Sequence, residues 1–392
     1  MNNSKKCGWF RRWGIPLLAF LLGAVLSAGA VLAVVSRRPG TKLRELEQLI
    51  DDKFIAESDE KAMEDAAASA MVKALGDRWS HYMSAEDMIS NRNTMNSQYV
   101  GVGISISLRE DGQGYDITKV EENGPAAAAG VQVGDILLGA DDKTVADDGG
   151  DAVTAAVRGE KGTDVTLHLQ RDGAPLSLTV TRDTVAVQVA SGTMLDGQIG
   201  YVRINAFHHN CAQETVAVID DLLNQGAAAL IFDVRNNPGG YTDELVTVLD
   251  KLLPEGPVFQ TESYDGTTHT DYSDADCVSV PMAVLVNGDS YSAAEFFAAA
   301  LQEYGVAAVV GEKTCGKGYY QCTYGFSDGS GVALSVGKYF TPNGVSLIGL
   351  GVTPDEEIAV DEDTAAAIAA GTLPLAEDPQ ILAAVQAVKS GK

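Results

Sequence analysis

The sequence predicts a multi-domain protein in which a β domain precedes an α/β domain, and three patterns support this prediction. Between about residues 99 and 182, short alternating runs separated by glycine turns are typical of β-strands. From about residue 184, apolar strand-like runs alternate with amphipathic helical runs, which favours an α/β domain with a largely parallel sheet. An uncharged apolar run near the N-terminus adds a predicted membrane helix.

The apolar run at residues 15–35 predicts the compartment of the protein. About 21 residues at ~1.5 Å each extend ~31 Å, which is enough to cross the hydrocarbon core of a bilayer. Basic residues before the run favour a cytoplasmic N-terminus, although basic residues also follow it. We expect an uncleaved single-pass anchor in the cell membrane; a cleaved signal peptide is the alternative, since residues 27–30 are small. In both cases the remaining chain lies outside the cytoplasm.

Composition excludes several classes of protein. The chain has 392 residues, with 28 basic against 54 acidic side chains and a formal net charge of −26. Phosphate binding needs clustered Lys and Arg, so nucleic acid is excluded as the main partner. Five cysteines in this length exclude a small disulfide-stapled scaffold. The length itself suggests about two to three domains.

The elements follow from local periodicity. Residues 41–95 are expected to be helical, because apolar residues recur there at helical spacing and an Ala-rich stretch ends at Gly76. In the β domain we expect strands at 102–108, 115–120, 135–140, 165–170 and 176–181. In the α/β domain we expect strands at 199–204, 229–234, 282–286 and 307–311, and helices at 213–224, 243–253 and 292–304. Two Ala-rich helices, 364–370 and 379–388, close the chain.

The β domain carries a binding motif. The run YVGVGI at residues 99–104 places two glycines before a strand, so its backbone N–H groups can cradle a carboxylate and the strand edge can pair with an extended peptide. With residues 122–137, ENGPAAAAGVQVGDIL, this run resembles a PDZ domain. The resemblance implies peptide binding at Val100, Gly101, Val102, Gly103 and Ile104. The alternative is a small β domain whose glycines only make turns.

Three segments of the α/β domain carry reactive groups. Residues 232–240, FDVRNNPGG, run from a buried strand into a glycine turn that can offer N–H groups to an oxyanion. Residues 286–295, VNGDSYSAAE, place serines where a strand meets a helix, and the helix dipole there favours a developing anion. Residues 311–321, GEKTCGKGYYQ, put Lys317 between two glycines in an apolar stretch. Because burial disfavours the ammonium form, Lys317 is a candidate base. None of the five histidines lies in such a turn, and the G-x-S-x-G elbow is absent.

Together these segments resemble the carboxyl-terminal processing peptidases, also called tail-specific proteases. The resemblance extends to residues 76–88 and 349–355, so it covers nearly the whole chain after the anchor. It departs at Tyr291, where the family has alanine, at Ala294 in place of serine, and at Cys315 in place of an aromatic residue. It implies that Ser292 is the nucleophile, that Lys317 is its base and that Gln321 supports the lysine. It also implies an oxyanion hole formed by the N–H of Ala293 and a glycine N–H, from Gly239 or Gly240.

The resemblance implies a membrane-anchored serine endopeptidase with a crotonase-like core, cleaving extracytoplasmic proteins whose C-terminal tails the PDZ domain captures. No metal or cofactor is implied, and a homodimer is possible through the N-terminal helices. The expected divisions are a tail and anchor at 1–40, a helical region at 41–96, a PDZ domain at 97–183, a protease core at 184–360 and a helical segment at 361–392. A non-catalytic PDZ receptor and a crotonase-like thioester enzyme are the alternative functions.

Simpler interpretations accompany each site residue. Ser292 with Glu295 fits a capping box, and Ser290 is the next candidate nucleophile. The run 311–317 mimics a phosphate-binding loop but has Gly318 where Ser or Thr must hold magnesium. The spacing of His208, His209 and Cys211 matches no usual zinc site. Cys315 and Cys322 either form a disulfide around the base or remain a pair of thiols. Arg158 either links the PDZ domain to the core or is a plain surface arginine.

Overall fold

The computed structural model describes residues 42–109 and 111–390. The chain divides into two compact units, with the boundary after Leu75. The predicted anchor at 15–35 lies outside the described residues. Within those residues, no helix has the length and apolar character that a membrane span requires. The first unit contains two helices, α3 (Lys42–Lys53) and α4 (Glu60–Lys73). The Asp59 side chain caps α4 by accepting a hydrogen bond from the Ala62 N–H at 3.0 Å.

The second unit begins with a short strand, β1 (His81–Met83), followed by α5 (Ala85–Met95). The helical prediction for 41–95 is therefore interrupted. The cause is tertiary pairing, because β1 forms an antiparallel ladder with β18 (Gly331–Phe340), far away in the sequence. Local periodicity carries no information about such a partner.

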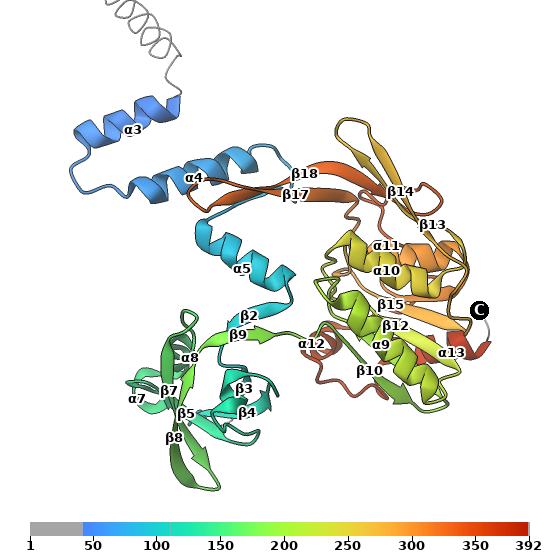
Figure 1. The fold of residues 1–392 in the computed structure, drawn as a ribbon, viewed down its shortest axis with the longest axis horizontal. Coiled ribbons are helices and arrows are strands. Elements are labelled where there is room, and N and C mark those ends of the chain that lie inside the picture. Colours follow the sequence, from blue (N-terminus) through green and yellow to red (C-terminus); the bar gives the residue numbers. More distant parts are fainter. Residues whose placement is uncertain (1–41, 110, 391–392) are drawn as a thin grey trace, which may run out of the picture. The chain divides into compact units, whose positions relative to one another are not determined.

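The β domain is an antiparallel sheet flanked by short helices (Figure 1). Its strands follow the order β3-β4-β5-β7-β8, so β3 lies at an edge. The ribbon of β2 and β9, which are paired with each other, leads into and out of this sheet. The core is built on Ile117, Leu137 and Leu167. The elements are β2 (Gln98–Gly101), β3 (Ile104–Leu108), β4 (Tyr115–Val120), α6 (Pro125–Ala128), β5 (Ile136–Ala140), β6 (Lys143–Thr144), α7 (Val145–Asp148), α8 (Gly150–Val157), β7 (Asp164–Arg171), β8 (Ala174–Thr181) and β9 (Asp183–Ala186).

The α/β domain contains the predicted parallel sheet, in the order β10-β11-β12-β15-β16-β19. Only β10 runs antiparallel to its neighbour. Three helices, α9, α10 and α11, pack on one face, and α13 packs on the other (Figure 1). The elements are β10 (Ala190–Leu195), β11 (Ile199–Ile204), α9 (Cys211–Asn224), β12 (Ala229–Asp233), α10 (Thr242–Leu252), β15 (Met282–Val286), α11 (Ala293–Glu303), β16 (Ala307–Gly311), β19 (Glu356–Glu357), α12 (Glu362–Ala370) and α13 (Pro379–Ser390).

A second sheet, which the sequence did not predict, completes this domain. It has the order β1-β18-β13-β14, with β17 also paired to β18. Its further strands are β13 (Gly256–Ser263), β14 (Thr268–Ser273) and β17 (Tyr319–Gly325). The strands are partly exposed and rich in polar residues, so they lack the apolar alternation that predicts a strand. The loop from β16 to β17 carries Lys317.

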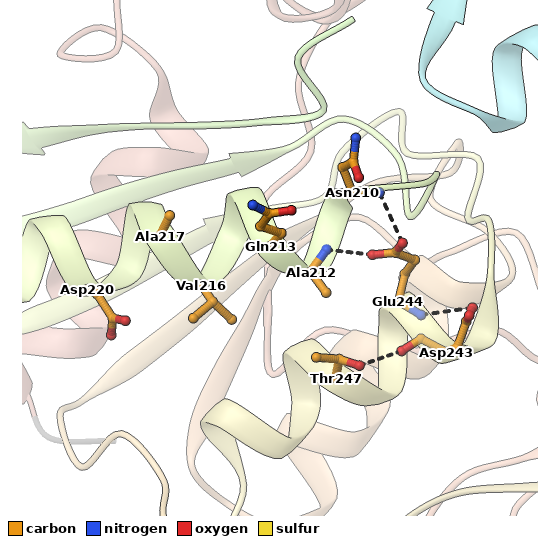
Figure 2. Close-up of a pocket in the computed structure, with 9 residues that line it drawn as sticks. All are labelled: Asn210, Ala212, Gln213, Val216, Ala217, Asp220, Asp243, Glu244 and Thr247. Carbon is orange, nitrogen blue, oxygen red and sulfur yellow. Dashed lines mark hydrogen bonds between the residues drawn. The ribbon is translucent and has the colours of Figure 1, made fainter. Parts of the chain in front are cut away.

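Polar contacts hold the helices in place around the sheet. The carboxylate of Glu244 on α10 accepts hydrogen bonds from the N–H groups of Asn210, at 3.0 Å, and Ala212, at 2.7 Å, at the start of α9. Figure 2 shows this link at the end of a groove of about 620 Å³ between the two helices. Beside α13, Arg235 forms ion pairs with the buried Asp233 at 2.6 Å and with Asp378 at 2.8 Å. These pairs connect the start of α13 to the turn after β12.

Candidate active site

Ser292 lies where the loop after β15 enters α11. It is the N-cap of that helix, is 6 % exposed, and has φ 58° and ψ −127°. A positive φ is uncommon for a residue with a side chain and costs conformational energy. Such strain persists where surrounding structure enforces it, and it clusters at functional sites. The Ser292 N–H donates to the Glu295 carboxylate at 3.0 Å, which is one of the two hydrogen bonds of the capping box that the sequence predicted. Ser292 therefore caps α11 and stays the candidate nucleophile.

Glu295 connects the start of α11, with the candidate nucleophile, to the loop of the candidate base. Its carboxylate is fully buried and accepts four hydrogen bonds. The donors are Thr314 Oγ1 at 2.6 Å, the Gly316 N–H at 2.7 Å, the Lys317 N–H at 2.8 Å and the Ser292 N–H at 3.0 Å. Burial raises the pKa of Glu295, and the donated hydrogen bonds oppose that rise. Through one side chain, the backbones of Ser292 and Lys317 are therefore fixed relative to each other.

Ser290 has a structural role. It is fully buried, and its hydroxyl donates to the backbone oxygen of Val234 at 2.8 Å. It also accepts the Asn287 N–H at 3.0 Å. These two hydrogen bonds hold the β15–α11 loop against the end of β12. Because its hydroxyl is already bonded in this way, Ser290 is the weaker of the two candidate nucleophiles.

The glycine turn after β12 packs directly against Ser292. Gly239 has φ +86°, and a Cβ placed on it would stand 2.7 Å from the Ser292 Cβ and 2.9 Å from the Ala293 nitrogen. Only a glycine fits this approach. The Gly239 N–H donates to the Asn237 side-chain oxygen at 2.8 Å. In contrast, the N–H groups of Gly240 and Ala293 donate no hydrogen bond to any part of the chain that the structure describes. Of the two glycines expected in the oxyanion hole, Gly240 therefore has the available donor.

Lys317 is half-buried beside two aromatic rings. Its Nζ lies 4.7 Å from the centroid of Trp79 and 5.6 Å from that of Tyr291. Burial lowers the pKa of Lys317, and the nearby Arg78 acts in the same direction, while Cys315, Glu295 and Asp77 act against it. No hydrogen bond joins its amine to the Ser292 hydroxyl within residues 42–109 and 111–390.

Gln321 lies near Lys317 in sequence but bonds elsewhere. Its Nε2 donates to the Tyr319 backbone oxygen at 3.2 Å and to Ser335 Oγ at 3.0 Å. The expected contact with Lys317 is therefore not formed in this structure. The residues that do contact the lysine, Trp79 and Tyr291, were missed as site residues. The aromatic side chain in the segment 76–88 was the signal that could have identified Trp79.

The predicted peptide-binding loop of the β domain divides into two parts. Val100 and Gly101 belong to β2 and pair with β9. The N–H groups of Val102 and Gly103 have no hydrogen-bond acceptor among the described residues, and Ile104 begins the edge strand β3. Two free N–H groups followed by a free strand edge can receive a carboxylate and an extended chain.

The structure corrects one cysteine hypothesis and gives no metal site. Cys315 and Cys322 are free, so the disulfide considered around the base is not formed. Cys315 instead accepts a hydrogen bond from Arg78 Nη2 at 3.2 Å. Among the residues whose positions are described, no three His, Cys, Asp or Glu side chains gather as metal ligands, and the segment with His208 and Cys211 forms no such group.

Two family models and several relatives match this chain. The model of peptidase family S41 matches residues 198–358, and that of the PDZ domain matches residues 100–181. The carboxy-terminal processing protease CtpA of Bacillus subtilis is 31% identical over 341 residues, covering 86% of this chain and 73% of that protein. A "Probable CtpA-like serine protease" of Staphylococcus saprophyticus is 30% identical over 321 residues, covering 81% of this chain and 65% of that protein.

A solved structure shares the fold. It is that of a Bacteroides fragilis protein assigned to the S41 proteases, with a TM-score of 0.55 at 16% identity, covering 87% of this chain and 93% of that one. At this identity the likeness shows the shared fold, and the family rests on the family models and on the Bacillus subtilis relative. The chain belongs to peptidase family S41 and is a serine peptidase with a PDZ domain, related to the carboxy-terminal processing proteases.

Proposed function

We propose that this chain is a membrane-anchored endopeptidase that cleaves extracytoplasmic proteins with a Ser292–Lys317 dyad. The observation that carries the proposal is the Glu295 carboxylate, which fixes the backbones of both residues at once. The anchor rests on the uncharged run at 15–35. Alkaline extraction of membranes tests it, because an anchored chain stays in the pellet and a released chain appears in the supernatant.

The chemistry requires the Lys317 amine to be neutral. The Ser292 oxygen forms a bond to the scissile carbonyl carbon, and its proton passes to Lys317. The tetrahedral oxyanion, held by the N–H groups of Ala293 and Gly240, collapses as the C–N bond breaks, and the leaving amine takes the proton from Lys317. Water then attacks the acyl ester and gives a proton to Lys317, which returns it to the departing Ser292 oxygen. Burial supports this role, because it lowers the pKa of the lysine.

Substrate selection is assigned to the PDZ domain. The free N–H groups of Val102 and Gly103 would bind the terminal carboxylate of a protein tail, and the edge of β3 would pair with the residues before it. Partners of this enzyme are therefore proteins or peptides with accessible C-termini. Gln321 remains a proposed support for Lys317 that would act only after its side chain leaves Ser335.

Cleavage of an unfolded protein tests the dyad. The soluble chain from about residue 41 is incubated with casein, and fragments are followed by gel and mass spectrometry. Ser292→Ala and Lys317→Ala should each lose at least about 1,000-fold in rate, because nucleophile and base act as a unit. Ser290→Ala is the matched control and should lower stability while it keeps the nucleophile. Full activity in Ser292→Ala would show that the nucleophile is misassigned.

A further inference from the structure

We propose that Trp79 and Tyr291 form a seat that holds the Lys317 side chain as an ammonium ion apart from Ser292. The two are positioning residues, and the inference rests on the proposed function of Lys317 as the base. It gives the resting enzyme a defined place for that amine. It also makes release of the amine depend on loss of its proton.

The geometry is that of a cation lying over two neighbouring aromatic rings. The Lys317 Nζ lies 4.7 Å from the Trp79 centroid and 5.6 Å from the Tyr291 centroid, both within the ~6 Å reach of cation–π attraction. The rings also contact each other, with centroids 5.8 Å apart. The attraction belongs to the ammonium form, since a neutral amine lacks the charge that the ring quadrupole binds.

Trp79 is held firmly enough to act as a seat. The Asp77 carboxylate accepts the N–H groups of Trp79 and Ser80, each at 3.1 Å, and the Ser80 hydroxyl at 2.6 Å. Ser80 in turn accepts the Ser335 N–H at 2.9 Å, and the next residues form β1 against β18. The backbone of Trp79 is therefore fixed to the same sheet that carries the strand after Lys317.

Other charged groups around Lys317 act on its proton in both directions. Arg78 also lies over the Trp79 ring, with its guanidinium carbon 4.1 Å from the centroid, and its Nη2 donates a hydrogen bond to Cys315. It repels the ammonium, whereas Glu295, Asp77 and Cys315 favour it. Burial, like Arg78, disfavours the ammonium form of Lys317. The two rings of the seat also stabilise the ammonium form of Lys317. Removal of either ring must therefore favour the neutral amine.

Once the proton leaves, the rings hold the amine only by packing. The neutral amine is the form that can accept the Ser292 proton. The same event therefore frees the side chain and makes it competent as a base. A seated ammonium accounts for the absence of a hydrogen bond between the Lys317 amine and the Ser292 hydroxyl among the described contacts.

Fluorination of Trp79 tests the seat without changing its shape. The chain has three tryptophans, so in the full chain Trp9→Phe and Trp13→Phe leave Trp79 alone. Biosynthetic tryptophans with increasing numbers of fluorines weaken the ring quadrupole stepwise while burial stays constant. The readout is the pH midpoint of Lys317 acylation by an amine-reactive ester, measured by peptide mass spectrometry in a Ser292→Ala background. We expect the midpoint to fall by about half a unit to one unit across the series.

Three substitutions set the direction of the effect. Tyr291→Leu, which keeps apolar bulk, should lower the midpoint, and Tyr291→Phe, which restores a ring face, should return it toward the parent. Arg78→Ala should raise it, because a repelling charge is lost. Tyr264→Ala, which changes an exposed tyrosine on the β13–β14 hairpin, should leave it unchanged.

The outcomes separate the seat from the proposed function. A midpoint that stays constant across the fluorination series and in Tyr291→Leu overturns the seat. With Ser292 restored, the acid limb of kcat/KM against pH should move with the labelling midpoint. If Lys317→Ala cleaves casein at the parent rate, the proposed base is wrong, whatever the labelling shows. Thermal unfolding of each variant confirms that the fold is retained.

Discussion

At the scale of single residues, the site depends on one buried carboxylate. Glu295 belongs to α11, yet three of its four donors lie in the loop after β16. A buried carboxylate with four donors is fully satisfied, so its burial is compensated. The side chain fixes where α11 begins relative to the loop with Lys317.

Glu295→Gln should weaken both the fold and the reaction. An amide offers one acceptor oxygen and presents an NH₂ group to donors that need an acceptor, and each buried donor left unpaired costs about 1–3 kcal/mol. We expect the free energy of unfolding to fall by about 2–4 kcal/mol and kcat/KM by at least about 10-fold. Denaturant unfolding and a peptide cleavage assay measure the two effects.

Glu303→Gln is the matched control for this substitution. Glu303 ends the same helix and accepts hydrogen bonds from Thr341 Oγ1 and the Asn343 N–H, away from Ser292. It should lose stability but keep the parent kcat/KM. Equal losses of activity in both variants would mean that Glu295 acts only through general stability.

At the scale of elements, the turn after β12 fits the start of α11 with no space to spare. Gly239→Ala places a methyl group 2.7 Å from the Ser292 Cβ and imposes a positive φ on alanine. We expect kcat/KM to fall at least about 100-fold, because the oxyanion donors and the nucleophile shift relative to each other. The loss is measured with the parent and variant under single-turnover conditions.

Gly266→Ala separates backbone strain from crowding. Gly266 has a similar φ, +81°, but a Cβ there meets nothing within 4 Å. It should cost about 1–2 kcal/mol of stability and leave cleavage intact. A comparable loss of activity in Gly266→Ala would contradict the contact between the turn and Ser292.

Periodicity predicted some elements well and others not at all. The strands β11, β15 and β16 match the expected ranges, because buried parallel strands are short uninterrupted apolar runs. The hairpin β13–β14 and the pair β17–β18 were missed, since their stability comes from pairing between polar, half-exposed strands. The short helix α8 was also missed inside a region that otherwise alternates as strands.

At the scale of the whole molecule, the sequence could identify the reactive segments but not how they meet. The local patterns indicated a serine at the start of a helix and Lys317 as candidate base, and the resemblance selected Ser292 and gave both residues their roles. Trp79, by contrast, contacts Lys317 through a fold that pairs β1 with β18, a long-range contact that no local pattern encodes. The direction of the Gln321 side chain could not be predicted either, because it depends on the hydrogen bond with Ser335, a residue on another strand.

The PDZ domain should select substrates by their terminal charge. With Ser292→Ala to prevent cleavage, a labelled peptide ending in a free carboxylate should bind at least about 10-fold more tightly than its amidated form, because hydrogen bonds to a charged group contribute about 1.5–3 kcal/mol. Fluorescence anisotropy measures both affinities. Equal binding of the two peptides would remove the carboxylate from the recognition mechanism.

The central claim is that Ser292 forms the acyl-enzyme with Lys317 as its base. The most direct measurement is acid quenching of the enzyme during turnover of an activated peptide ester, followed by peptide mapping for the acyl adduct. The account predicts an adduct on the peptide that contains Ser292, lost in Ser292→Ala and formed far more slowly in Lys317→Ala. An adduct on Ser290, or one formed at the parent rate without Lys317, would contradict it.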